Sequence, residues 1–183
     1  MAEYKHIILE KDEIARILTR MAHEVVEKTG NSLDVTLIGI LTRGAHLASR
    51  IGRKIESWSG SPPQIGVVDI TPYRDDVKRT PDAPPHSDVA VTVDDQTVVL
   101  VDDVINTGRT VRAALELLGH LGNPKKVIVA SLIDRGHREL PIKADIVGKN
   151  VDVDSTERVN VLVQELDGCD QVIVSKIQLL KRV

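Results

Sequence analysis

Apolar side chains recur along this chain with two different spacings, which predict alternating helices and strands. Between residues 12 and 29 they fall at every third or fourth position: Ile14, Ile17, Leu18, Met21 and Val25. This spacing is typical of a helix that buries one face. Asp12 is the expected N-cap, and Gly30 is expected to end the helix.

Short continuous runs of aliphatic and β-branched residues predict buried strands at 35–41, 65–70, 98–101 and 127–133. Two more helices are expected, one running to about Ser57 and one beginning near Val111 and ending at Gly122. Further strands are expected at 159–163 and 172–177. Because strands and helices alternate, we predict an α/β fold in one domain, residues 1–183, with a mainly parallel sheet flanked by helices on both faces.

Two stretches interrupt this alternation. Residues 71–96 contain four prolines and many aspartates, with a weak hairpin expected near 89–93. A loop of this length in a compact domain is usually a lid or a disordered segment. Residues 134–150 are charged and are expected to form turns.

The composition is that of a globular protein and excludes several classes. With 183 residues, 42% of them hydrophobic, the chain is long enough to bury a core without disulfides. Its single cysteine, Cys169, excludes a disulfide framework and favours the reducing cytoplasm. No apolar run approaches the ~20 residues of a membrane span, and the first residues lack a signal-peptide core. We therefore expect no membrane partner.

Net charge and aromatic content bear on nucleic acids. A formal net charge of −3 argues against attraction of the whole molecule to nucleic acid, but not against a local basic face. The aromatic residues are only Tyr4, Tyr73 and Trp58. We therefore expect an aliphatic core and no aromatic platform on which single strands could stack.

Residues 98–110 carry the most informative pattern. An apolar strand leads into Asp102 and Asp103, and a Thr-Gly-x-Thr turn at 107–110 then opens a helix. In parallel α/β sheets ligands bind at the carboxyl edge, where this strand delivers its two acids. Backbone N–H groups and hydroxyls at the helix start can hold a phosphate, and Gly108 lets the backbone come close to it. Such a pair of features is suited to a sugar phosphate.

The alternative is a capped strand followed by an ordinary helix start, which is the usual meaning of an isolated Asp-Asp pair. The apolar strand before the turn and the periodic helix after it favour the ligand site. The pattern is not a Walker A loop, because the lysine is missing and the spacing differs, and it is not GxGxxG.

The same string resembles the 5-phosphoribosyl-1-pyrophosphate (PRPP) signature of type I phosphoribosyltransferases. Residues 39–44 resemble the pyrophosphate loop of that class, 69–76 the start of its flexible loop, and 134–150 its base-binding hood. Together with residues 18–24, these segments are similar to the PyrR family, whose members are RNA-binding attenuators of pyrimidine operons and uracil phosphoribosyltransferases. The resemblance spans nearly the whole chain. It implies a type I phosphoribosyltransferase-like fold with a small hood at about 134–163 and a flexible loop at about 71–96.

The resemblance also implies individual roles. Asp102 and Asp103 would lie under the ribose, near the Mg²⁺ that PRPP carries, and would act with Arg43 in catalysis. PRPP or nucleotide would contact Thr42, Arg43, Arg74, Asp102, Asp103, Val104, Ile105, Asn106, Thr107, Gly108, Arg109 and Thr110. Uracil would contact Asp134, Arg135 and Val159. No cluster of His, Asp or Glu has the spacing of a metal site formed by protein ligands alone.

For RNA the resemblance implies a basic face made of Thr19, Arg20, His23, His137, Arg138, Lys143 and Lys149. A turn after Gly136 would direct His137 and Arg138 away from the ligand, towards the helix that carries Arg20 and His23. The alternative is a solvated helix and loop. The resemblance further implies binding of UMP, of the mRNA leader of pyrimidine genes and of a second copy in a homodimer, with higher assembly left open.

Several functions remain open. The chain is expected to be a bifunctional regulator and enzyme, a regulator with little catalysis, or a salvage enzyme without RNA binding. A purine or orotate phosphoribosyltransferase fits residues 98–110 but not 134–150. The chain departs from the family at Asn106, where an aromatic residue is usual, at 77–96, and at 151–155, where two extra acids are expected to weaken a neighbouring RNA surface.

Overall fold

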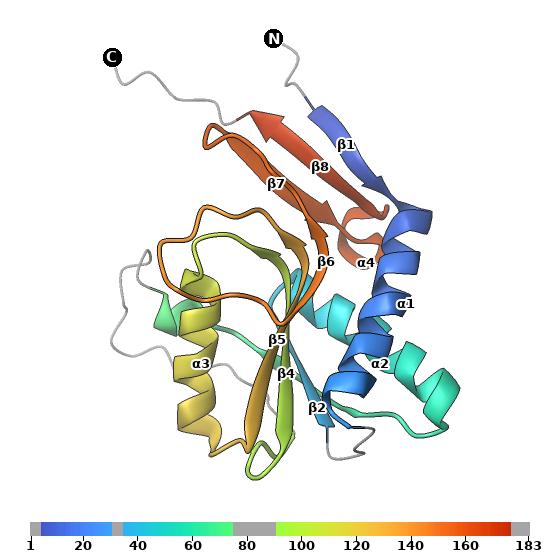
Figure 1. The fold of residues 1–183 in the computed structure, drawn as a ribbon, viewed down its shortest axis with the longest axis vertical. Coiled ribbons are helices and arrows are strands. Elements are labelled where there is room, and N and C mark those ends of the chain that lie inside the picture. Colours follow the sequence, from blue (N-terminus) through green and yellow to red (C-terminus); the bar gives the residue numbers. More distant parts are fainter. Residues whose placement is uncertain (1–4, 31–34, 75–90, 177–183) are drawn as a thin grey trace.

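Five parallel strands form the central sheet of the computed structural model, which describes residues 5–30, 35–74 and 91–176. Their order across the sheet is β3 (Gln64–Val68), β2 (Val35–Ile40), β4 (Thr97–Ile105), β5 (Lys126–Asp134) and β6 (Ile146–Asn150). Helices α1 (Lys11–Lys28) and α2 (Arg43–Ser59) cover one face, and α3 (Arg109–Leu121) covers the other (Figure 1). The predicted α/β fold with a parallel sheet between helices is confirmed.

Burial on both faces explains why these strands read as continuous apolar runs. On β4, Val99 and Val101 pack with α1 and α2, whereas Val98 and Leu100 pack with α3. Every residue of β2 is buried. A parallel strand covered by helices on both sides has no solvated face on which polar residues could alternate.

A second, three-stranded sheet lies beyond the carboxyl edge of the first (Figure 1). It is antiparallel, in the order β1 (Lys5–Glu10), β8 (Gln171–Lys176) and β7 (Glu157–Leu162), and the short helix α4 (Gln164–Asp167) joins β7 to β8. We call these three strands the small sheet. Leu9, Val161 and Val172 bury their side chains in the same core as α1 and α2. The last two predicted strands therefore exist but do not belong to the parallel sheet.

Several local predictions need correction. The capping box of α1 is formed by Glu10 and Glu13, so Asp12 is not its N-cap. Strand β4 runs past the predicted end at residue 101 as far as Ile105, because Val104 and Ile105 pair with β5. Strand β6 lies inside the stretch expected to form only turns. Strand β1 was not predicted, because its single fully buried residue, Leu9, gives no readable alternation.

The long excursion is only partly described. It begins with a 3-10 turn, Thr71–Tyr73, and residues 91–96 form bends and turns rather than a strand. The rest of the expected lid and hairpin, residues 75–90, lies outside the described residues. Within the described ranges, no helix is long and apolar enough to cross a membrane.

Candidate active site

Two glycines bring the start of α2 against the ends of β2 and β4. A Cβ on Gly44 would lie 2.4 Å from the carbonyl oxygen of Val101, and one on Gly39 would lie 2.4 Å from the Cα of Ala45. Any larger residue at these positions would push the helix away from the sheet. The close fit places Thr42 and Arg43, at the start of α2, beside the acids of β4, and the Leu41–Thr42 peptide bond there is cis.

The acid pair sits at the carboxyl edge of the central strand. Asp102 is buried, and its Oδ1 accepts a hydrogen bond from the backbone N–H of Asp103 at 2.9 Å. Among the residues that the structure describes, its Oδ2 has no hydrogen-bond partner. Burial, and then the negative charge of Asp103, raise the pKa of Asp102 well above its usual value. Burial likewise raises the pKa of Asp103, while its hydrogen bond with Asp102 and the nearby Arg43 oppose this rise. The pair is thus a buried site of negative charge that a cationic ligand would stabilise.

Beside the acids, the turn into α3 lines a cavity of about 290 Å³. Its walls are Arg74, residues 104–110 and Glu139. Gly108 caps α3 with a φ of 91°, and the Thr107 carbonyl accepts hydrogen bonds from the N–H groups of Glu139 and Leu140 at 3.1 and 3.0 Å. A helix N-terminus that opens into a cavity is a ready anion site. The residues predicted to hold the phosphate are therefore brought together, although the Arg109 side chain pairs with Glu139.

On the other side of the acids, a cavity of about 500 Å³ extends to the small sheet. The predicted residues Arg43, Asp103, Arg135 and Val159 all line it. Val104 and Asn106 line both cavities, so the cavity at the start of α3 adjoins the cavity under the small sheet. Sequence reasoning missed three polar residues that line this wall: Arg158, Asn160 and Ser175. Arg158 and Asn160 flank the predicted residue Val159 on β7, and this position was the only sign of them in the sequence.

The predicted uracil residue Asp134 organises the loop that follows β5. Its Oδ1 accepts a hydrogen bond from the N–H of Gly136 at 2.9 Å, and its Oδ2 pairs with Arg138 Nη2 at 2.6 Å. Arg138 also donates to the carbonyl oxygens of Asn106 and Ile142, each at 2.7 Å. The expectation that Arg138 points towards α1 is wrong, because its donors instead bond within the loop after β5 and to Asn106 at the end of β4.

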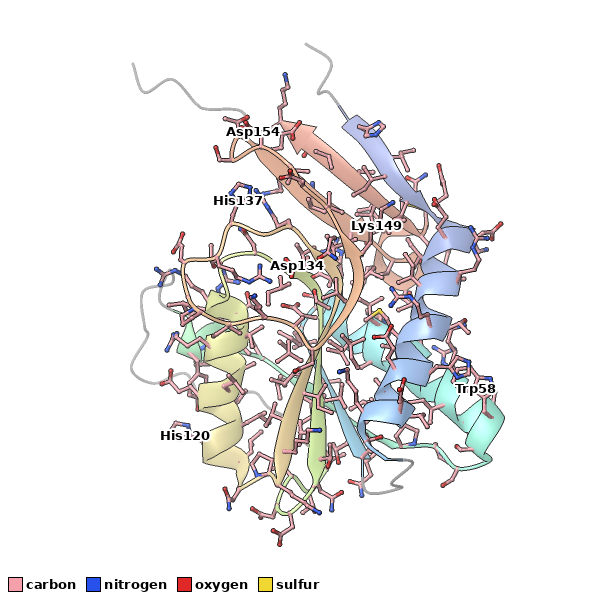
Figure 2. All side chains as sticks on the ribbon, viewed as in Figure 1. Trp58, His120, Asp134, His137, Lys149 and Asp154 are labelled. Carbon is pink, nitrogen blue, oxygen red and sulfur yellow. The ribbon has the colours of Figure 1, made fainter. Side chains whose placement is uncertain are left out.

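The residues predicted for RNA fall into two groups. Near α1, Arg20 donates to the carbonyl oxygen of Val147 at 3.0 Å, and Lys149 donates to that of Ile8 at 3.3 Å. His137, by contrast, contacts the carbonyl oxygen of Val153 through Nε2 at 2.8 Å. Figure 2 shows His137 on the opposite side of the molecule from Trp58, which stacks on His23 of α1. One chain therefore does not gather these residues into one face.

Arg43 has a partner that sequence reasoning did not find. Its Nη2 donates to Asp167 Oδ1 at 2.9 Å, and Asp167 Oδ2 accepts a hydrogen bond from the N–H of Val163 at 2.9 Å. Arg50, two turns further along α2, pairs with Glu165 and Asp170 at 2.6 and 2.8 Å. These ion pairs fasten α4 to α2, and Asp167 holds the Arg43 guanidinium at the mouth of the pocket.

Known proteins share this architecture. The model of the phosphoribosyl transferase domain family matches residues 6–165. A hypoxanthine phosphoribosyltransferase from Staphylococcus aureus superposes with a TM-score of 0.71 at 20% identity, covering 93% of this chain and 90% of that one. The Trypanosoma cruzi hypoxanthine phosphoribosyltransferase gives a TM-score of 0.73 at 16% identity, covering 93% and 95%. Fold and site together define a type I phosphoribosyltransferase.

Two relatives narrow this class. The bifunctional protein PyrR of Chloroflexus aurantiacus is 51% identical over 91% of this chain and 93% of its own length. The bifunctional protein PyrR of Pelotomaculum thermopropionicum is 49% identical over 95% and 97%. The chain therefore belongs to the PyrR family of phosphoribosyltransferases.

Proposed function

We propose that this protein transfers the phosphoribosyl group of PRPP to uracil, forming UMP and pyrophosphate, and that UMP-bound protein binds the mRNA leader of pyrimidine genes. The catalytic part is carried by one observation: the cavity at the start of α3 and the cavity under the small sheet share Val104 and Asn106 in their walls, and Asp103 lines the second of them. Two adjoining cavities of this kind suit a 5′-phosphate, a ribose and a base in that order.

The charges of the pocket match the charges that develop during transfer. The bond between ribose C1 and pyrophosphate breaks as the uracil nitrogen bonds to C1, so positive charge grows on the ribose and negative charge on pyrophosphate. Asp103 faces the first of these charges, and Arg43 faces the second, with Arg74 also lining the pocket. Charged groups fixed before the reaction stabilise such a transition state without having to reorganise.

The acid pair fits the Mg²⁺ that accompanies PRPP in this class of enzyme. Asp102 Oδ2 is a buried carboxylate oxygen without a hydrogen-bond partner, and oxygen is the donor that Mg²⁺ prefers. In residues 5–30, 35–74 and 91–176, no three metal-binding side chains come together, so we propose that PRPP supplies most of the ligands. When bound, the ion neutralises leaving-group charge.

The base, RNA and assembly parts of the proposal rest on the family. We propose that uracil lies against Arg135 and Val159, which line the second cavity. The name bifunctional protein, carried by the relatives, supports a second activity, and we assign it to RNA binding by Thr19, Arg20, His23, His137, Lys143 and Lys149. Arg138 is left out of this set because its guanidinium bonds to Asp134, Asn106 and Ile142. We further propose that the protein is a cytoplasmic homodimer. Residues 1–183 are proposed to act as one domain, because the two sheets share one core.

Purified protein with Mg²⁺ and PRPP should form UMP from uracil faster than it converts hypoxanthine or orotate. Asp103→Asn should retain the fold and lose most turnover, because it removes a charge that matters chiefly in the transition state. Asp152→Asn, at an exposed position outside both cavities, is the matched control and should keep wild-type turnover. No UMP formation by the wild type would refute the enzymatic proposal.

The regulatory half is tested separately, with leader RNA from a pyrimidine operon and a scrambled RNA of equal length at one salt concentration. Preferential binding of the leader, strengthened by UMP, is expected, because UMP and RNA would then be coupled sites. Equal binding of the two RNAs would leave a salvage enzyme without RNA recognition.

A further inference from the structure

Helices α1 and α2 meet through two matched pairs of side chains. Lys54 Nζ donates to Thr19 Oγ1 at 2.7 Å, and one turn further along both helices Trp58 stacks on His23, with ring centroids 3.7 Å apart and planes inclined by 7°. Residues four apart lie on the same face of a helix, so the four side chains form one continuous ridge. We call these four residues the α1–α2 ridge.

Trp58 is unusual in being both ordered and accessible. Its side chain is held by the stack on His23, yet the residue remains 45% exposed. An exposed tryptophan at the end of a helix contributes little to a core, and here its ring borders open space. It is therefore a rigid aromatic surface already placed for a contact.

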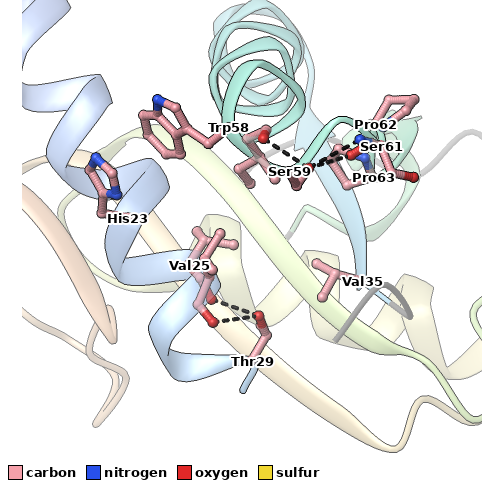
Figure 3. A pocket seen from close by; sticks show the side chains of 11 residues that line it. His23, Val25, Thr29, Val35, Trp58, Ser59, Ser61, Pro62 and Pro63 are labelled. Atoms are coloured by element: carbon pink, nitrogen blue, oxygen red, sulfur yellow. Dashed lines mark hydrogen bonds between the residues drawn. The ribbon is translucent and has the colours of Figure 1, made fainter. Parts of the chain in front are cut away.

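Next to this ring lies a cavity of about 370 Å³ between the ends of the two helices (Figure 3). Its walls include Val25, Ile55 and Pro62. Two of the hydroxyls that line it are already bonded: Thr29 Oγ1 donates to the carbonyl of Val25 at 2.8 Å, and Ser59 Oγ donates to that of Ile55 at 2.9 Å. The cavity thus offers apolar and aromatic contact, which suits the flat face of a ring.

We propose that the α1–α2 ridge binds single-stranded RNA, with an unpaired base stacked on Trp58 and the adjoining phosphate near Lys54. This inference rests on the proposed RNA-binding function and adds to it two residues of α2. His23 is in face-to-face contact with Trp58, so RNA that reaches His23 also reaches Trp58. The flanking charge on this side of the ridge is the ammonium of Lys54, which suits a phosphate.

A single tryptophan is enough to stack one base, although the low aromatic content of the sequence suggested no platform for single-stranded nucleic acid. Every base has an aromatic face, and proteins that read RNA loops stack unpaired bases on aromatic side chains. His23 fixes the ring before RNA arrives, so little side-chain entropy remains to be lost on binding. The scarcity of aromatic residues therefore does not exclude stacking, which depends on where an exposed ring such as Trp58 lies.

The proposal can be tested without a label, because Trp58 is the single tryptophan of the chain. Leader RNA is titrated into the full-length protein with UMP present, and tryptophan emission is recorded beside an independent measurement of binding. Emission should change and saturate with the same midpoint as binding. Trp58→Ala should weaken binding by about fivefold to a hundredfold, the range for losing one base–aromatic stack.

Two further variants separate stacking from general damage. Trp58→Phe retains a ring and should recover most of the affinity, and Leu166→Ala, at a residue of α4 that is 48% exposed, should bind RNA like the wild type. All three variants should synthesise UMP at the wild-type rate, because neither residue lines the catalytic cavities.

Three results would overturn the proposal. If wild-type protein binds leader RNA without a change in emission and Trp58→Ala binds equally well, the ridge is not an RNA contact, although the regulatory function stands. If Trp58→Ala lowers self-association in sedimentation and leaves RNA affinity unchanged, a second copy of the chain covers this face. If wild-type protein prefers leader RNA no more than scrambled RNA, the proposed regulatory function fails, and this inference fails with it.

Discussion

Arg138→Gln tests whether the loop after β5 belongs to the nucleotide pocket or to a separate RNA surface. The Arg138 guanidinium pairs with Asp134 at 2.6 Å and donates to the carbonyl oxygens of Asn106 and Ile142, each at 2.7 Å. Glutamine is shorter and uncharged, so it can satisfy at most part of this set. Asp134 and the two carbonyls would then lose partners in a region from which water is largely excluded.

The magnitude follows from the burial of this pair. The Arg138 and Asp134 side chains are only 19% and 16% exposed. A hydrogen bond to a charged group contributes about 1.5–3 kcal/mol, and breaking a fully buried ion pair costs roughly 3–5 kcal/mol. Since this pair keeps some contact with water, we expect the free energy of unfolding to fall by about 2–4 kcal/mol. The KM for uracil should rise as the loop that carries Arg135 loosens.

Urea unfolding and steady-state kinetics measure both effects. Arg138→Lys keeps the positive charge but not the planar fork, so its loss should be smaller than that of Arg138→Gln. Lys143→Gln, at an exposed position on the same loop, removes one positive charge without a buried partner and is the matched control. The reasoning is refuted if Arg138→Gln unfolds at the wild-type urea concentration, keeps its KM for uracil and loses only RNA affinity.

Three further predictions concern the acid pair, the phosphate turn and α4. Burial raises the pKa of Asp102 in the folded protein above its value in the unfolded chain. Between these two pKa values the folded protein binds more protons than the unfolded chain, so the stability of the wild type falls as pH rises from the lower value to the higher. Asp102→Asn removes this loss, so its gain in urea midpoint over the wild type should grow from about pH 4 to about pH 7. Gly108→Ala should lower the free energy of unfolding by about 1 kcal/mol and raise the KM for PRPP, because φ is 91° at this position and Gly108 lines the cavity at the start of α3. Asp167→Asn should raise the KM for PRPP severalfold in steady-state assays, because the Arg43 guanidinium loses its charged partner.

Each of these predictions has a contradicting outcome. A midpoint gain for Asp102→Asn that is the same at both pH values would show that burial does not raise the pKa of this carboxyl. If Gly108→Ala unfolds and turns over like the wild type, the turn at 107–110 does not contribute to the anion site. An unchanged KM for PRPP in Asp167→Asn would mean that Arg43 keeps its position without its partner on α4. The control is Asp170→Asn, which removes the neighbouring ion pair with Arg50 and leaves the Arg43 pair intact.

The sequence predicts those parts of this protein that depend on neighbours along the chain. The apolar runs of β2, β4 and β5 are readable because strands buried on both faces contain little else. The acid pair and the phosphate turn follow one another on a single strand–turn–helix unit, so their proximity needs no tertiary information. Arg43 joins them because the ends of neighbouring parallel strands share one edge of the sheet.

Contacts between distant segments could not be predicted in this way. Nothing near Arg43 in the sequence indicates Asp167, which lies 124 residues further along the chain. Arg138 has the same charge whether it faces RNA or Asp134, and only the path of the loop decides between them. Strand β1 carries too few buried side chains to show a period, and its pairing with β8 depends on a segment at the far end of the fold.

That pairing sets an order in which the two halves of the pocket can be built during synthesis. All five strands of the central sheet have been translated once residue 150 is made, whereas the small sheet needs β8, whose Gln171 bonds to Glu10 across 161 residues. At about 5–20 residues per second, the small-sheet wall of the second cavity can close only seconds after the cavity at the start of α3 can form. Proteolytic removal of β8 from the finished protein would take Ile173 and Ser175 from that wall and would also open the shared core that Val172 and Val174 fill.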